Sequence, residues 1–136
     1  MQEFSLRLSE AAELIGASTP QSDLRFTGIT HVDSEIEPGD IFCAIPGAKV
    51  HGAEFIDSAK HRGAVAVITD EAGSQKNSGL PMLVVKDVRG ASAIVAASLY
   101  QSPSRDLVTI GVTGTNGKTT VTTLLYQLCS LAGRES

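Results

Sequence analysis

Apolar residues along this chain fall into short blocks that predict strands and helices in turn. Short runs of β-branched and aromatic residues are typical of strands, and apolar residues three and four positions apart are typical of amphipathic helices. The expected strands are 26–32, 41–45, 65–69 and 82–85, and the expected helices are 9–15, 53–62 and 91–100. Because strands alternate with helices, the pattern predicts a layered α/β fold.

Local signals mark the ends of these elements. Ser9 is expected to cap the first helix and Gly16 to end it, Gly63 to end the second helix, and Asp87 to cap the third. Residues 71–79 are polar and are expected to form a loop. The side chains expected in the core include Phe42, Phe55, Ile56, Ala59 and Tyr100.

The last third of the chain carries a glycine-rich motif between an apolar run and a helical pattern. Leu107–Ile110 is typical of a buried strand, and residues 111–120 read GVTGTNGKTT. The apolar residues that follow at helical spacing are Val121, Leu124, Leu125, Leu128, Leu131 and Ala132. Strand, glycine loop, Gly-Lys-Thr and helix are the layout of a P-loop, although Val112 stands where the general pattern has its first glycine. A glycine-rich turn with a chance lysine is the alternative, and the strand-to-helix context favours the P-loop.

This layout suits the binding of ATP and Mg²⁺. Glycines allow backbone N–H groups to approach phosphate oxygens, and the helix N-terminus adds unpaired donors. Lys118 would place its charge on the β- and γ-phosphates as the catalytic residue, and the Thr119 hydroxyl would bind Mg²⁺. The expected ATP-binding residues are Gly114, Thr115, Asn116, Gly117, Lys118, Thr119 and Thr120.

The chain is expected to divide at about residue 104, where Ser102-Pro103-Ser104 is typical of a linker. Residues 1–104 would form a small α/β domain. Residues 105–136 hold one strand, the P-loop and one helix, and a lone strand–helix unit leaves both faces of its strand uncovered. We therefore expect a fragment of a longer enzyme whose central ATP-binding domain is truncated.

Composition narrows the possible partners. The 136 residues are 42% hydrophobic and 19% charged, with a net charge of −4, which argues against nucleic acid or an anionic membrane surface as a partner. No apolar run approaches the roughly 20 residues of a membrane helix, and the first residues lack the features of a signal peptide. Cys43 and Cys129 are expected to be reduced core thiols, and His31, His51 and His61 to be structural or exposed.

The loop Gly114–Thr119 resembles the ATP loop of the Mur ligases and of their relative folylpolyglutamate synthase. The likeness extends back to about Ile29 through Asp33-Ser34 and Pro38-Gly39-Asp40-Ile41-Phe42. The order of these motifs resembles that found in the Mur ligases that add the third amino acid of the peptide. In the D-Ala-D-Ala-adding type the loop usually reads G-x-S-G-K-T, so Asn116 in this loop is less similar to that type.

This resemblance implies a small Mur-ligase N-terminal domain followed by the start of a P-loop central domain. It implies a cytoplasmic, monomeric enzyme of peptidoglycan synthesis that uses ATP and Mg²⁺. Such an enzyme activates the carboxylate of UDP-MurNAc-L-Ala-D-Glu as an acyl phosphate and joins it to meso-diaminopimelate or L-lysine. The remaining catalytic apparatus and the choice of amino acid would lie beyond residue 136, so the fragment alone is expected to be inactive.

The resemblance also assigns a site for the UDP end of the substrate. The expected contacts are Val32, Ser34, Ala48, Lys49 and Val50. Glu35 replaces an arginine common in the family and is expected to point away from the diphosphate, and His51 replaces a common aspartate. Taken alone, Ser34 is also compatible with an ordinary turn and Lys49 with a solvated loop lysine.

Three other functions remain open at this point. The chain could belong to a D-Ala-D-Ala-adding ligase, be a non-catalytic UDP-sugar-binding module, or be part of a P-loop NTPase or kinase with an unrelated first domain. Ser34 and the 48–52 loop favour the Mur ligases over the last of these.

Overall fold

A computed structural model describes residues 4–18, 20, 22–76 and 78–134 of the chain. Contacts within the chain divide it into two units, Met1–Pro103 and Ser104–Ser136, called unit 1 and unit 2 below. Residues 1–3, on which the expectation about a signal peptide rests, lie outside the described residues. So does Asn77 of the expected polar loop.

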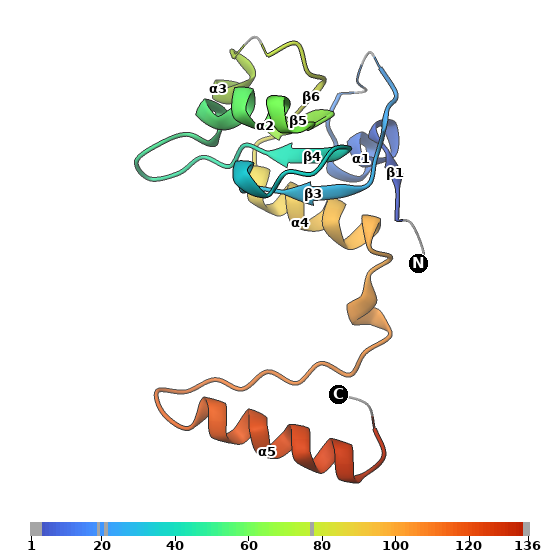
Figure 1. The fold of residues 1–136 in the computed structure, drawn as a ribbon, viewed down its shortest axis with the longest axis vertical. Coiled ribbons are helices and arrows are strands. Elements are labelled where there is room, and N and C mark those ends of the chain that lie inside the picture. Colours follow the sequence, from blue (N-terminus) through green and yellow to red (C-terminus); the bar gives the residue numbers. More distant parts are fainter. Residues whose placement is uncertain (1–3, 19, 21, 77, 135–136) are drawn as a thin grey trace. The chain divides into compact units, whose positions relative to one another are not determined.

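Unit 1 is built on a parallel four-stranded sheet in the order β3-β4-β5-β6. Its strands are β3 (Gly28–Thr30), β4 (Asp40–Cys43), β5 (Ala66–Thr69) and β6 (Met82–Val84). Helix α2 (Ile56–Arg62) covers one face, and α1 (Leu8–Ile15) and α4 (Val88–Leu99) cover the other (Figure 1). The predicted α/β fold is confirmed.

The strands are mostly apolar because both faces of the sheet are covered. In β4, Ile41 and Cys43 pack in the cluster with α1 and α4, whereas Phe42 packs in the cluster with α2. All three side chains are at most 1% exposed. Cys43 is a free, buried core thiol as predicted, and burial raises its pKa to about 12.

Short elements account for several differences from the sequence prediction. These are β1 (Leu6–Arg7), β2 (Arg25–Phe26), α3 (Glu71–Ser74) and the 3-10 helices η1 (Asp33–Glu35), η2 (Gly52–Phe55) and η3 (Pro103–Arg105). The single strand expected over 26–32 is wrong, because β2 pairs antiparallel with β1 while β3 pairs parallel with β4. The helix expected from 53 starts as η2, and part of the expected loop 71–79 is α3.

Helix ends were predicted better than helix starts. Gly16 and Gly63 end α1 and α2 with φ of 66° and 108°, a backbone region that favours glycine. Asp87 caps α4 by accepting the Gly90 N–H at 2.9 Å, but the helix begins at Val88 rather than residue 91. Ser9 is not the cap of α1, because the N-cap position is Arg7.

Two predicted core positions are wrong. Phe55 is 43% exposed because it ends η2 at the surface, beside the buried Ile56 and Ala59. Tyr100 is 41% exposed, and its ring lies edge-on to Phe4 with centroids 5.6 Å apart.

Among its described residues, unit 2 contains one α-helix, α5 (Lys118–Leu131), and the end of η3. Leu107–Ile110 forms no strand, and Val108 is 84% exposed, so the predicted buried strand is wrong for this chain. A strand needs neighbours to accept its backbone hydrogen bonds and to cover its side chains. Leu131 at the end of α5 is 85% exposed and Cys129 is only half-buried, so Cys129 is not a core thiol here. Within the part of the chain that the structure describes, no helix has the length and apolarity needed to span a membrane.

Asp70 connects β5 to α3. Its Oδ1 atom accepts the Gly73 N–H at 2.8 Å and lies 3.0 Å from His51 Nε2. The Gly73 hydrogen bond is the main cause of a lowered pKa of Asp70, with a smaller contribution from His51 and an opposing one from burial. A folded state that prefers the carboxylate gains stability from it above the ordinary pKa and loses it as the pH falls.

We therefore expect the variant Asp70→Asn to lose less unfolding free energy than the original chain when the pH is lowered. The comparison is urea denaturation at several values between about pH 5 and pH 3, which brackets the ordinary pKa of 3.8. Glu13→Gln controls for removal of a surface carboxylate. If the unfolding free energy fell equally with pH in the original chain and in Asp70→Asn, the lowered pKa of Asp70 would be contradicted.

Candidate nucleotide sites

The sheet brings the two segments that are predicted to contact UDP to the same side, where the carboxyl ends of its strands lie. Strands β3 and β4 are parallel neighbours, so the residues that follow them emerge at the same end of the sheet. Val32 and Ser34 follow β3, and Ala48–Val50 follow β4. Open α/β sheets bind ligands at this carboxyl end of their strands.

The segment after β3 is held in place by helix α2. Ser58 Oγ donates to Asp33 Oδ2 at 2.6 Å, and Arg62 Nη1 donates to the Ser34 carbonyl at 3.3 Å. The Val32 N–H donates to Thr30 Oγ1 at 3.1 Å. Ser34 is exposed, and its hydroxyl makes no hydrogen bond to any described residue, so it is free to meet a ligand. Glu35 is exposed as well.

The segment after β4 is a loop with a narrow base. Pro46 and His51 form an isolated antiparallel bridge, and the Gly52 N–H donates to the Ile45 carbonyl at 3.0 Å. A Cβ atom on Gly52 would lie 2.6 Å from Ile45 N, so only glycine fits at the base. Ala48, Lys49 and Val50 are exposed at the loop tip, where backbone and side chains face solvent. We refer to residues 46–51 as the β4 loop.

His51 ties this loop to the rest of unit 1. Its Nδ1 atom accepts the Ala53 N–H at 3.0 Å, which makes His51 the cap of η2. Because Nδ1 is an acceptor, the ring proton of the neutral imidazole is on Nε2, and Nε2 donates to Asp70 Oδ1. His51 is therefore structural, as predicted; His31 is exposed, and His61 Nδ1 is 2.7 Å from the Asp57 carbonyl.

Sequence reasoning missed Ser58, Arg62 and Asp70, which support the two segments. They are 19 to 28 residues away from their partners, and no spacing signal marks them. Among the described residues there is no group of three or more metal-ligating side chains.

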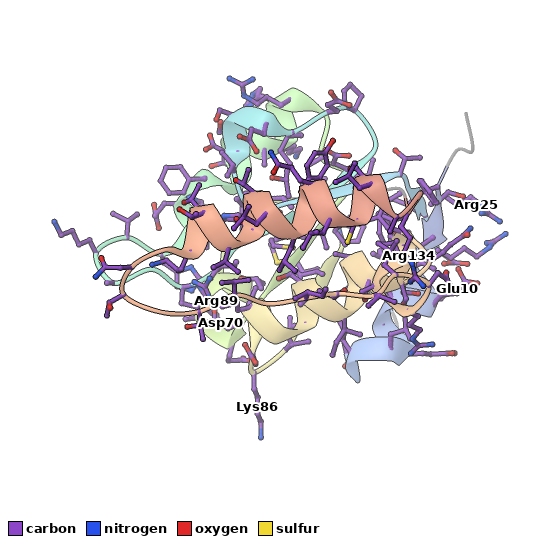
Figure 2. The ribbon with its side chains drawn as sticks, turned by 90° about the horizontal axis from the view of Figure 1, so that it is seen from below. Glu10, Arg25, Asp70, Lys86, Arg89 and Arg134 are labelled. Atoms are coloured by element: carbon purple, nitrogen blue, oxygen red, sulfur yellow. The ribbon has the colours of Figure 1, made fainter. Side chains whose placement is uncertain are left out.

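A groove of about 1100 Å³ lies elsewhere along the same edge, at the carboxyl ends of β5 and β6. Asp70, Lys86, Asp87 and apolar side chains of α1 and α4 line it, and Lys86 extends away from the ribbon (Figure 2). None of the five predicted UDP contacts lines this groove. They lie on an exposed loop and an exposed turn.

In unit 2 the seven predicted ATP-binding residues form the loop before α5 and its first turn. Gly117 is the N-cap of α5 with φ of 76°, and Gly114 has φ of 147°, so both positions favour glycine. Lys118 Nζ donates to the Gly114 carbonyl at 2.6 Å, so the side chain curves back over the loop. The first N–H groups of α5 have no partner within the helix.

This arrangement fits a nucleotide phosphate chain. A Cβ atom on Gly117 would meet no atom within 4 Å, so the loop is open on that side. The Thr119 hydroxyl makes no hydrogen bond to the described residues. The Thr122 and Thr123 hydroxyls, in contrast, donate to backbone carbonyls of α5. Thr119 thus has an unused hydroxyl in the first turn of α5, next to the Lys118 ammonium.

Curated relatives share sequence with most of the chain. A Streptomyces avermitilis protein named UDP-N-acetylmuramoyl-L-alanyl-D-glutamate–2,6-diaminopimelate ligase is 49% identical over 120 residues, which cover 87% of this chain and 24% of that protein. A Deinococcus radiodurans protein named UDP-N-acetylmuramyl-tripeptide synthetase is 43% identical over 127 residues, covering 93% of this chain and 26% of that protein. The chain thus spans about a quarter of the length of these relatives.

Solved structures share the fold. An Acinetobacter baumannii protein named UDP-N-acetylmuramoylalanyl-D-glutamyl-2,6-diaminopimelate–D-alanyl-D-alanyl ligase matches with a TM-score of 0.66 at 22% identity, covering 88% of this chain and 27% of that chain. MurF ligase from Thermotoga maritima in complex with ADP matches with a TM-score of 0.55 at 30% identity, covering 75% and 23%. The model of the Mur ligase family, catalytic domain, matches residues 25–102, more than half of the chain and all within unit 1. The chain therefore belongs to the Mur ligase family.

Proposed function

We propose that the chain is the N-terminal part of an ATP-dependent ligase that adds the third amino acid to UDP-MurNAc-L-Ala-D-Glu in peptidoglycan synthesis. The observation that carries this proposal is the 49% identity to a diaminopimelate-adding ligase over 87% of the chain. The names of the Streptomyces relatives favour diaminopimelate over lysine as the added amino acid. Unit 1 would bind the UDP end of the substrate, and unit 2 would begin the ATP-binding domain.

ATP, when bound, supplies the phosphoryl group that activates the substrate carboxylate for attack by the amino acid. The residues of unit 2 would hold it in place. The N–H groups of residues 114–120 would donate to phosphate oxygens, and Lys118 would exchange its bond to the Gly114 carbonyl for the β- and γ-phosphates. The Thr119 hydroxyl would hold Mg²⁺. The ADP complex of the Thermotoga relative supports nucleotide binding in this family.

Unit 1 would bind the uridine diphosphate through two exposed segments. The Ser34 hydroxyl would donate to a phosphate oxygen, since the described residues leave it unused. Val32 and the β4 loop, through Ala48, Lys49 and Val50, would contact the uracil and cover the nucleotide. We further propose a monomeric cytoplasmic protein. Its net charge of −4 argues against nucleic acid or an anionic membrane as a partner.

A second candidate is a ligase that adds D-Ala-D-Ala. It is favoured by the likeness to MurF from Thermotoga maritima at 30% identity. The two functions differ in both substrates. A chain extended to the length of its relatives can therefore be assayed with UDP-MurNAc-L-Ala-D-Glu plus diaminopimelate or lysine and, in parallel, with the diaminopimelate-containing UDP-MurNAc-tripeptide plus D-Ala-D-Ala. Faster turnover with D-Ala-D-Ala would replace the first proposal by the second.

Titration of the 136-residue chain with UDP-MurNAc-L-Ala-D-Glu tests the substrate site. Amide chemical shifts should change at Val32–Ser34 and in the β4 loop. Ser34→Ala should weaken binding by roughly 1–3 kcal/mol, or about 5- to 150-fold in Kd, if its hydroxyl donates to a phosphate oxygen.

Glu35→Ala is the matched control on the same turn. It removes a negative charge near an anionic ligand and should be neutral or slightly favourable. No shifts in unit 1 at millimolar ligand would rule out unit 1 as the UDP site, and shifts confined to residues away from Ser34 and the β4 loop would rule out these two segments.

Lys118→Ala tests the ATP site in a chain extended to the length of its relatives. It should lower kcat by roughly 10²–10³ or more while leaving thermal stability unchanged, because an exposed charge that stabilises the transition state contributes little to packing. Lys118→Arg should fail as well, since a planar fork does not replace a compact ammonium. Lys86→Ala serves as the control, and a near-normal kcat in either Lys118 variant would exclude this loop as the catalytic ATP site.

A further inference from the structure

The β4 loop is closed tightly on itself, since a Cβ atom on Gly47 would lie 2.5 Å from the Val50 carbonyl oxygen, but its tip makes no hydrogen bond to the other described residues of unit 1. Its tip, Ala48–Val50, is exposed, and Val50 keeps 50% of its surface in solvent. The backbone hydrogen bond that closes it lies at its base, where the Gly52 N–H donates to the Ile45 carbonyl beside the Pro46–His51 bridge. An exposed loop closed by one narrow base can swing as a unit, so a further contact must define where the tip lies.

His51 supplies that contact from the last position of the loop. Both ring nitrogens are used, Nδ1 as acceptor from the Ala53 N–H and Nε2 as donor to Asp70, each at 3.0 Å. Two bonds on opposite sides of a planar ring fix its orientation. The Asp70 acceptor is a carboxylate, and a hydrogen bond to an ionised acceptor is stronger than one between neutral groups.

The bond joins two neighbouring strands at their carboxyl ends. His51 follows β4, Asp70 follows β5, and the two strands are paired in parallel. Asp70 is itself held by the Gly73 N–H at 2.8 Å. A Cβ atom on Gly73 would lie 2.9 Å from His51 Cε1, so α3 packs closely on the ring and needs glycine at this position. The side chains of His51 and Asp70 are 26% and 23% exposed, so the bond is partly shielded from water.

We propose that the His51–Asp70 hydrogen bond sets the position of the β4 loop and thereby the affinity of the UDP site. His51 and Asp70 are then positioning residues that need not touch the nucleotide. This inference rests on the proposed function of unit 1. It adds to that site a determinant of affinity, Asp70 after β5, that lies outside the predicted contacts.

Two substitutions of His51 separate its two hydrogen bonds. His51→Asn places an amide oxygen near the position of Nδ1, so it keeps the cap of η2 and loses the bond to Asp70. His51→Gln places an amide nitrogen near the position of Nε2, so it keeps a donor for Asp70 and loses the cap. Asp70→Ala removes the acceptor, and Asp70→Asn keeps an oxygen acceptor for both His51 and Gly73.

Two measurements on the 136-residue chain read out the effect. Backbone ¹⁵N order parameters of residues 48–50 without ligand report the ordering of the loop, and titration with UDP reports affinity. For His51→Asn and Asp70→Ala we expect lower order parameters and a Kd for UDP raised by about three- to tenfold, the range of one modest hydrogen bond. His51→Gln and Asp70→Asn should stay within about twofold of the original Kd, and their thermal midpoints show whether each variant is folded.

The double variant His51→Asn/Asp70→Ala should be no weaker in UDP binding than either single variant, because both remove the same bond. Unchanged order parameters in His51→Asn, or additive losses in the double variant, would overturn the proposal. If the original chain does not bind UDP at all, the proposed function of unit 1 fails, and the order parameters then still decide whether the bond positions the loop.

Discussion

Parallel pairing of β3, β4 and β5 is the constraint on which the site in unit 1 depends. It places the carboxyl ends of three strands side by side, so that Ser34, the β4 loop and Asp70 share one edge. The pairing is stable only because both faces of the sheet are covered, by α2 on one side and by α1 and α4 on the other (Figure 1). The position of the exposed segments therefore depends on the buried core.

The helices and turns around the sheet also hold the exposed segments. Ser58 and Arg62 of α2 bond to Asp33 and to the Ser34 carbonyl, and Asp70 bonds to His51. In this way the side chains with a proposed role in binding stay free, while their neighbours make the structural hydrogen bonds. A site of this kind presents unpaired donors to a ligand while the neighbouring side chains hold the exposed segments in place.

Unit 2 shows how much of a P-loop is local. The glycines at 114 and 117 have the backbone angles that the loop requires, and α5 begins at Lys118, although no strand forms ahead of the loop. Helix and turn hydrogen bonds join residues a few positions apart, so they form without distant partners. A strand has no such internal bonds, and Leu107–Ile110 stays extended and exposed.

The sequence by itself determined the α/β class, most helix ends, the P-loop and the family, because these depend on local spacing and on motifs in a fixed order. It did not reveal the break at Thr27, the exposure of Phe55 or the absence of a strand at 107–110. Those features depend on which segments pair and pack. The UDP contacts were assigned by resemblance and remain a proposal. Only the tertiary structure identified Ser58, Arg62 and Asp70 as their supports, since a hydrogen bond across 19 to 28 residues depends on the folded sheet and leaves no periodic trace in the sequence.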